Sequence, residues 1–221
     1  MNFNDQGDPF RELAKIKRDL LKAQKRLKLT KEKAEKTELK TLIDTLKMDL
    51  GWKLLDNGEH EKGLTLFISV SKNGDQERKI CGVSRALTDM GYYDEAQKLL
   101  MKGLRKFSES CNLWTGYGIV NNLLGNGVES LRCFEAAIEF GPKTPEFFYN
   151  KALALVNLRR YKEAISILDQ LIEHCPGQPV YLAVQILSSL TSHCILALGP
   201  YQRAKGFCVY YGQDYLPSMA I

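Results

Sequence analysis

Two histidine–cysteine dipeptides are the residues best suited to chemistry in this sequence. His174–Cys175 and His193–Cys194 begin 19 residues apart, and imidazole and thiolate are ligands that zinc prefers. Both dipeptides fall in stretches expected to be helical, where adjacent side chains diverge by about 100°. The two members of one dipeptide therefore rarely reach the same ion. We expect the cysteines to face a core and the histidines to cap a helix or face solvent, with no metal bound.

No other motif supports an enzyme. The G-x-G of "GNGVES" (125–130) follows an expected helix rather than a strand and lacks a third glycine, so a dinucleotide site is disfavoured. The sequence has no G-x-x-x-x-G-K-[ST], H-E-x-x-H or G-x-S-x-G motif. The sequence has three histidines and no nucleophile paired with any of them, so it offers no recognisable catalytic arrangement. We expect no catalytic residue and no cofactor.

The cysteine pattern and the N-terminal sequence indicate the cellular compartment of the protein. None of the six cysteines falls in a C-x-x-C pair, and most lie in apolar helical runs: Cys81, Cys111, Cys133, Cys175, Cys194 and Cys208. Reduced core thiols are typical of this pattern. The opening "MNFNDQGDPFRELAK" has no charged segment followed by an apolar run. We expect a cytoplasmic protein.

The basic character of the chain is concentrated near its start. The formal net charge is +5, yet residues 11–47 alone carry 13 Lys/Arg against 6 Asp/Glu. Residues 11–47 contain no aromatic side chain on which single-stranded bases could stack. Some of their charge is paired along a helix, for example Glu32 with Lys36. These residues could still be attracted weakly to phosphates or anionic lipids, whereas nucleic acid is a disfavoured partner.

Apolar residues in the arm (1–43) follow a heptad-like spacing of 3 and 4, at Leu13, Ile16, Leu20, Ala23 and Leu27. The pattern fades at Thr30 and restarts in another phase. This predicts either one long helix with a phase slip or two helices broken near 29–31. The arm is interpreted as a capping helix or as a coiled-coil-like docking arm that could also join two copies of the chain.

The sequence repeats itself at an interval of 33 or 34 residues. Four segments align, namely 44–76, 77–110, 111–144 and 145–178, and each divides into two amphipathic helices. Gly58, Gly91 and Gly125 fall at the central turn, where Arg159 replaces glycine in the fourth segment. Small residues follow five positions later and large apolar ones four beyond: Gly63, Ala96, Ser130 and Ala164, then Phe67, Leu100, Phe134 and Leu168.

This pattern resembles the tetratricopeptide repeat, W-x2-L-G-x2-Y, then A-x3-F, then P. The third segment supplies Trp114, Gly118, Phe134, Ala137 and Pro142, and the fourth supplies Phe148, Ala152, Leu155, Ala164, Leu168 and Pro176. The resemblance implies an all-α solenoid of antiparallel helix pairs over 44–178, with an N-terminal long helix and capping helices after it.

In that family the first helix of each repeat lines a concave groove that binds a protein or peptide. Carried over to this sequence, the groove positions richest in binding chemistry are Trp52, Arg78, Arg85, Asn112, Asn122 and Tyr149. We expect both arginines on an open face, where charge reversal spares the fold. The two-carboxylate clamp that grips chaperone C-terminal tails has no match here, because Gly82 and Gly116 stand at clamp positions.

Residues 179–221 follow the repeats and are interpreted as a capping helix with a degenerate fifth repeat, a region that could also join two copies of the chain. The run 179–198 has the length of a membrane span, but polar residues are spread through its middle. The sequence therefore predicts a protein–protein interaction module: an adaptor, a scaffold or a secretion-type chaperone. The alternatives are a membrane-associated assembly factor anchored through 179–198 and a nucleic-acid-associated factor that uses 11–47.

Overall fold

The structure is a computed structural model and describes residues 9–142 and 144–174. Within these residues the regular elements are all α-helices: α1 (Pro9–Leu29), α2 (Lys33–Asp56), α3 (His60–Ser69), α4 (Gln76–Asp89), α5 (Tyr93–Leu104), α6 (Cys111–Leu123), α7 (Gly127–Phe140), α8 (Pro145–Asn157) and α9 (Tyr161–His174). The predicted all-α class is confirmed. The chain forms two compact units, Met1–Ala96 and Gln97–Ile221, so the boundary falls within α5.

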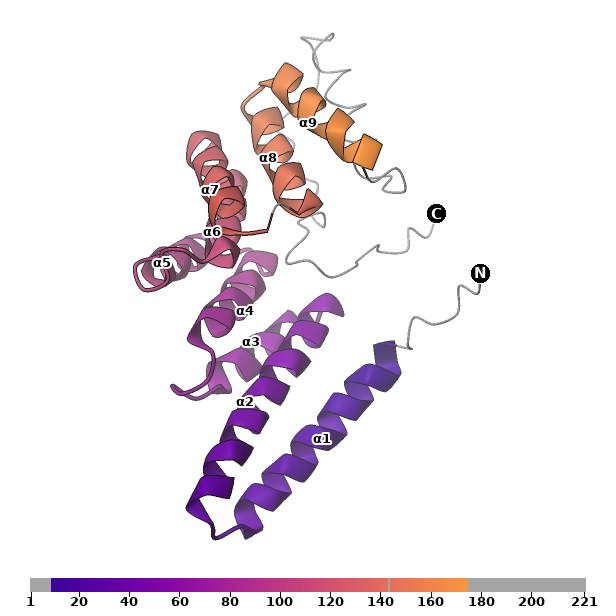
Figure 1. Ribbon diagram of the computed structural model, residues 1–221, viewed down its shortest axis with the longest axis vertical. Coiled ribbons are helices and arrows are strands. Elements are labelled where there is room, and N and C mark those ends of the chain that lie inside the picture. The colour runs from indigo at the N-terminus through magenta and orange to yellow at the C-terminus, as the bar shows by residue number, and fades with distance from the viewer. Residues whose placement is uncertain (1–8, 143, 175–221) are drawn as a thin grey trace. The chain divides into compact units, whose positions relative to one another are not determined.

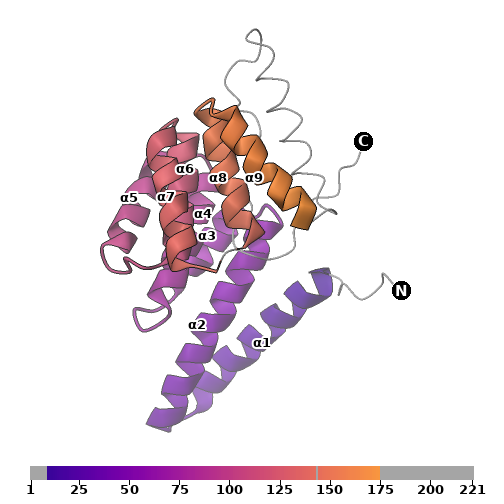
Figure 2. The same ribbon diagram turned by 45° about the horizontal axis from the view of Figure 1, so that its top comes forward.

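Helices α1 and α2 form an antiparallel hairpin within the first unit (Figures 1 and 2). Of the two arrangements left open by the sequence, the structure has two helices. The turn is held by Glu35, which accepts hydrogen bonds from Arg26 Nε at 2.7 Å and from the Thr30 hydroxyl. The heptad-spaced residues of α1 pack in one cluster with Ile43, Leu50 and Leu54. The apolar seam is thus covered by α2 within the chain.

The central turn of each repeat requires a left-handed backbone. Gly58, Gly91 and Gly125 have φ of 77°, 86° and 80°, and Arg159 is the non-glycine residue with positive φ, at 59°, within the described part of the chain. A side chain in this region costs about 1 kcal/mol or more because Cβ approaches the following carbonyl oxygen. The glycine turns read from the sequence are confirmed, and the fourth repeat makes the same turn under strain.

The small and large residues that follow each turn are buried, as the repeat predicts. Ala96, Ser130 and Ala164 are 0% exposed, and Phe67, Leu100, Phe134 and Leu168 are at most 1% exposed. The Phe67 ring of α3 lies directly on helix backbone: a Cβ built at Gly51 of α2 would be 2.8 Å from Phe67 Cζ, and one at Gly82 of α4 would be 2.5 Å from Phe67 Cε1. Glycine is needed at both positions because no side chain fits there.

Substitution Arg159→Gly is expected to raise the free energy of unfolding by about 1 kcal/mol, because glycine removes the left-handed strain. Urea denaturation followed by far-UV circular dichroism measures the change. The reverse substitution at the equivalent turn, Gly125→Arg, is the control and should lower stability by a similar amount, since open space surrounds that position. Equal stability of all three proteins would contradict the assignment of strain.

Substitution Gly82→Ala is expected to lower the free energy of unfolding by about 1–3 kcal/mol through overpacking against Phe67. The matched experiment is a double-mutant cycle with Phe67→Leu, whose smaller side chain leaves room for the added methyl group. The double variant should lose less stability than the sum of the two single losses. Strict additivity would show that the two residues are not coupled.

Candidate partner-binding surface on α2 and α4

Helices α2 and α4 are the first helices of the first two repeats, and they pack against each other in the first unit. Asp49 and Asp56 lie seven residues apart on α2, and Arg78 and Arg85 lie seven apart on α4, so each pair of like residues shares one helix face. Arg78 Nη2 is 2.7 Å from Asp49 Oδ1, and Arg85 Nη2 is 3.0 Å from Asp56 Oδ1. We call these the outer and the inner ion pair.

Trp52 lies on α2 between the two aspartates. Its ring meets Phe67 edge-on, with centroids 5.4 Å apart and planes inclined at 69°. The guanidinium carbon of Arg85 is 5.6 Å from the centroid of the Trp52 ring, within the range of a cation–π interaction. The half-buried Trp52 therefore connects the core beneath α2 to the charged surface above it. We name the α2–α4 surface by its six members: Asp49, Trp52, Asp56, Arg78, Arg85 and Asp89.

The two ion pairs differ in exposure. In the outer pair the side chains of Arg78 and Asp49 are 40% and 38% exposed, whereas in the inner pair Arg85 and Asp56 are 18% and 9% exposed. Exposed pairs are weak and exchange partners readily, but breaking a buried pair leaves an uncompensated charge. The expectation that Arg85 lies on an open face is therefore wrong. Charge reversal at Arg85 would place a third carboxylate beside Asp56 and Asp89.

Asp89 extends the inner pair at the C-terminal end of α4. Its Oδ2 is 3.6 Å from Arg85 Nε and 3.5 Å from Nδ1 of His60, at the start of α3. Burial raises the pKa of the Asp89 carboxyl above its ordinary value; Arg85 and His60 oppose the shift, and the charge of Asp56 adds to it. Sequence reasoning missed all three aspartates, although their helical spacing from Trp52 and Arg85 was a usable signal.

The substitutions Asp89→Asn and Asp56→Asn are expected to change the free energy of unfolding at pH 7 in opposite directions. The folded state holds the Asp89 proton more tightly than the unfolded chain does, so its carboxyl lowers stability as pH rises from about 3 to 7. Asp89→Asn should therefore gain stability relative to the wild type as pH rises through this range. Asp56→Asn should lose about 2 kcal/mol at pH 7 by leaving Arg85 without its inner partner. Thermal unfolding across pH measures both, and a pH-independent difference between Asp89→Asn and wild type would refute the shift.

The candidates in the second unit do not form one cluster. Tyr149 is 2% exposed and packs with Ile119 and Leu155, so its side chain belongs to the core. Asn122 Oδ1 accepts a hydrogen bond of 2.8 Å from Asn157 Nδ2, joining α6 to α8 at the surface. The amide oxygen of the half-buried Asn112 lies 3.8 Å from the thiol of Cys111. The structure thus brings together the three candidates of the first unit and separates those of the second.

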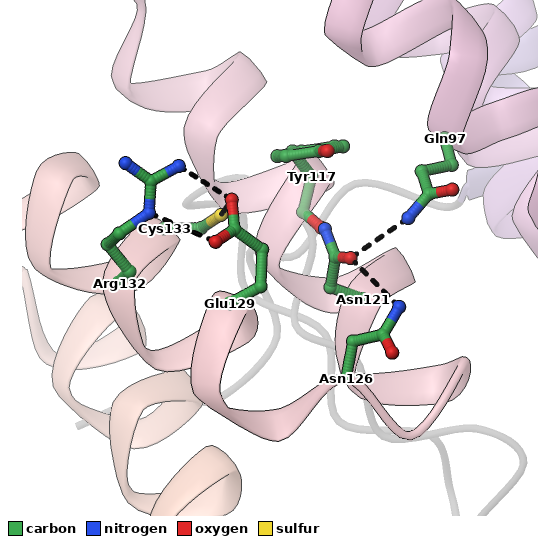
Figure 3. A network of polar contacts seen from close by, with 7 residues as sticks. All are labelled: Gln97, Tyr117, Asn121, Asn126, Glu129, Arg132 and Cys133. Carbon is green, nitrogen blue, oxygen red and sulfur yellow. Dashed lines mark hydrogen bonds and ion pairs between the residues drawn. The ribbon is translucent and has the colours of Figure 1, made fainter.

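A buried amide network in the second unit was also missed (Figure 3). Asn121 is 1% exposed; its Oδ1 accepts hydrogen bonds from Gln97 of α5 at 2.9 Å and from Asn126 at 3.4 Å, and its Nδ2 donates to the Tyr117 carbonyl at 2.8 Å. These bonds tie α5 to α6 and to the turn before α7. Asn121 lies eight residues after the buried Leu113, and this helical phase distinguishes it from Asn122.

Beside this network Arg132 and Glu129 form a bidentate pair at 2.6 and 3.0 Å on the surface of α7 (Figure 3). The Arg132 guanidinium carbon is 5.9 Å from the centroid of the Trp114 ring. Cys133, next in sequence, is 0% exposed, and burial raises the pKa of its thiol to about 12, with the Glu129 charge adding to the shift. Burial and the raised pKa therefore keep this thiol protonated at neutral pH in the folded unit.

Residues 9–142 and 144–174 offer neither a metal site nor a membrane span. No group of three or more His, Cys, Asp or Glu there is placed to hold a metal ion. No helix in the same residues combines the length and apolar character needed to cross a bilayer. Cys175, the dipeptide His193–Cys194, the run 179–198 and the proposed fifth repeat within 179–221 all lie outside the described residues.

Comparison with known proteins identifies the repeat. The sequence profile of the family described as tetratricopeptide repeat matches residues 145–177. TTC0263, described as a thermophilic TPR protein of Thermus thermophilus, has a similar structure, with a TM-score of 0.59, 17% identity and coverage of 82% of this chain and 94% of the other. MamA (41–end) from Desulfovibrio magneticus RS-1 gives a TM-score of 0.56 and 18% identity over 68% of this chain and 85% of the other. No curated protein sequence matches. The resemblance read from the sequence is confirmed for residues 145–177, which match the tetratricopeptide repeat, and the chain shares the α-solenoid fold of these structures.

Proposed function

We propose that this chain is a protein–protein interaction module that captures a partner segment on the α2–α4 surface. The single observation that carries the proposal is the outer ion pair, because Arg78 is 40% exposed and its paired carboxylate Asp49 is 38% exposed. A carboxylate from a partner can replace Asp49 at little cost, since an exposed pair contributes little to stability. Arginine and tryptophan are also enriched in binding hot spots.

The partner chemistry follows from what surrounds Arg78. Trp52 is half-buried and presents part of an aromatic ring one helical turn from Asp49 on α2. An extended or helical segment with one acidic group and a nearby apolar side chain would satisfy both residues. The inner pair holds the surface in shape and is not itself a contact for the partner. Within the second unit, Asn112 and Asn122 are candidates for partner contacts of their own, and we leave out the buried Tyr149.

Acidic chaperone tails stay disfavoured as partners. The clamp position occupied by Gly82 lies under the Phe67 ring, where a Cβ would come within 2.5 Å of the ring. An asparagine clamp at this site would require the ring to move. An adaptor, a scaffold and a secretion-type chaperone all use a surface of this kind. We place the protein in the cytoplasm, consistent with the buried, reduced thiol of Cys133.

The test is capture of partners from a cell extract on full-length protein, read by mass spectrometry and then by titration of the captured protein. Arg78→Glu is expected to weaken binding about tenfold or more, because it removes the cation and adds a repelling charge. Asp49→Asn is expected to strengthen binding several-fold, since the internal competitor for Arg78 loses its charge. The two opposite effects separate a binding role from a structural one.

Arg132→Glu in the second unit is the matched control, because it also reverses an arginine paired with a surface carboxylate. It should leave capture unchanged. Circular dichroism should show the same helix content in all variants. If Arg78→Glu and Arg132→Glu capture the same proteins with the same affinity, the α2–α4 surface is not the binding site.

A further inference from the structure

Helix α1 has two faces of opposite chemistry. Its apolar seam, which includes Leu13 and Leu20, is covered by α2. The helix carries eight basic residues against two acidic ones, a net charge of +6 in 21 residues. All eight basic residues are exposed: Arg11, Lys15, Lys17, Arg18, Lys22, Lys25, Arg26 and Lys28. An exposed helix of this charge attracts anionic surfaces over roughly a Debye length.

The two acids of α1 lie outside the outward half of the helix. At about 100° per residue, the half of the circumference centred on Arg18 and Lys25 contains the eight basic side chains and neither Glu12 nor Asp19. Glu12 instead pairs with Lys53 of α2 at 2.9 Å, and Asp19 lies at the edge, 3.9 Å from Lys22. We call this outward half the basic face of α1. No acidic residue of α1 lies within it along a helix about 31 Å long, and Arg26 at its edge pairs with Glu35 of α2.

Two leucines lie within the basic face. Leu21 is 53% exposed and Leu29, the last residue of α1, is 81% exposed. Leu29 is flanked in sequence by Lys28 and, across the turn, by Lys31, which is also exposed. Isolated surface leucines are ordinary. Two large apolar side chains inside a wholly basic face form an amphipathic pattern that is distinct from the covered seam on the other side.

The basic face is preformed, because contacts within the chain hold α1 in place. The α1–α2 hairpin (Figure 2) is fixed by its own core cluster, and its turn is held by Arg26 Nη2 and Glu35 Oε1 at 2.7 Å. Binding therefore requires no folding of the helix, which removes the ordering cost that isolated basic segments incur.

We propose that the basic face of α1 docks on an anionic lipid surface, with Leu21 and Leu29 entering the headgroup region and the lysines and arginines contacting lipid phosphates and carboxylates. The positive charges supply attraction that fades with salt, and the leucines supply burial that salt does not remove. The lysine stems follow the surface while their ammonium groups stay in water.

The leucines favour lipid over other polyanions. On a nucleic-acid backbone exposed leucines bury nothing, and between Arg11 and Leu29 the basic face has neither an aromatic ring for stacking nor an Asn or Gln for base edges. An acidic protein would need two apolar sockets about 12 Å apart between its carboxylates. A lipid surface accepts the leucines at any spacing. The inference is independent of partner capture on the α2–α4 surface, which is measured without lipid.

The test is co-sedimentation of the full-length protein with vesicles of equimolar phosphatidylcholine and phosphatidylserine, compared with phosphatidylcholine alone. We expect binding to the anionic vesicles only, weakening as salt is raised. Arg18→Glu with Lys25→Glu should reduce the partition coefficient about tenfold or more. The matched control is Lys98→Glu with Arg105→Glu, an exposed Lys and Arg also seven residues apart, which changes the net charge equally and should bind far more tightly than the α1 variant.

Leu21→Gln with Leu29→Gln tests the apolar contribution. Both side chains are exposed, so the fold is retained, and we expect vesicle binding to fall several-fold and to become fully sensitive to salt. Val128→Gln, at a 74% exposed position of α7, is the control. No preference for anionic vesicles, or equal loss in the two charge-reversal variants, would overturn the proposal. So would leucine variants that bind as wild type, or tighter binding of a DNA or RNA duplex that depends on Arg18 and Lys25.

Discussion

The ring of Phe67 packs directly against the backbones of two helices, and this contact sets the spacing between α2 and α4. A single methyl group at Gly51 or Gly82 would overlap the ring. With no side chains between them, α2 and α4 approach closely enough for Arg78 and Arg85 to reach across to Asp49 and Asp56. The charged surface is thus a consequence of the glycines beneath it. The second unit repeats the contact once, where Phe134 meets Gly118.

The close approach of α2 and α4 also gives the two similar ion pairs different roles. The inner pair is nearly enclosed by Trp52, Asp89 and the packed helices, so it contributes to the shape of the surface. The outer pair lies where solvent competes for both charges, so its arginine can change partner without loss of the fold. One seven-residue spacing therefore supplies a structural pair and an exchangeable pair, and burial alone distinguishes them.

Much of the fold could be predicted because the signals are local. A left-handed turn demands glycine, and a small residue five positions on demands a close helix contact, so the four turns follow directly from the sequence. At Arg159 the packing of the helices imposes the same left-handed turn on a residue that disfavours it. The break between α1 and α2 was left open because residues 29–32 contain neither glycine nor proline, and it is fixed by Glu35 reaching back to Arg26 and Thr30.

The site was harder to predict because exposure depends on neighbours far along the chain. Arg85 appears open on its own helix and is covered only because Asp56 and Trp52 arrive from α2. Tyr149 has the right position for a groove and is buried by residues of α6 and α9. Asn121 and Asn122 differ by one residue and face opposite environments, since one step along a helix turns a side chain by about 100°.

The buried cysteines give each unit an internal reporter of its own opening. Cys81 lies in the first unit at 3% exposure and Cys133 in the second at 0%. A thiol reagent can reach either sulfur only when the helices around it separate, so the rate of modification at each cysteine measures local unfolding of its unit in the native protein. The two halves of the solenoid can therefore be followed separately, without any added label, to learn whether they open together or one before the other.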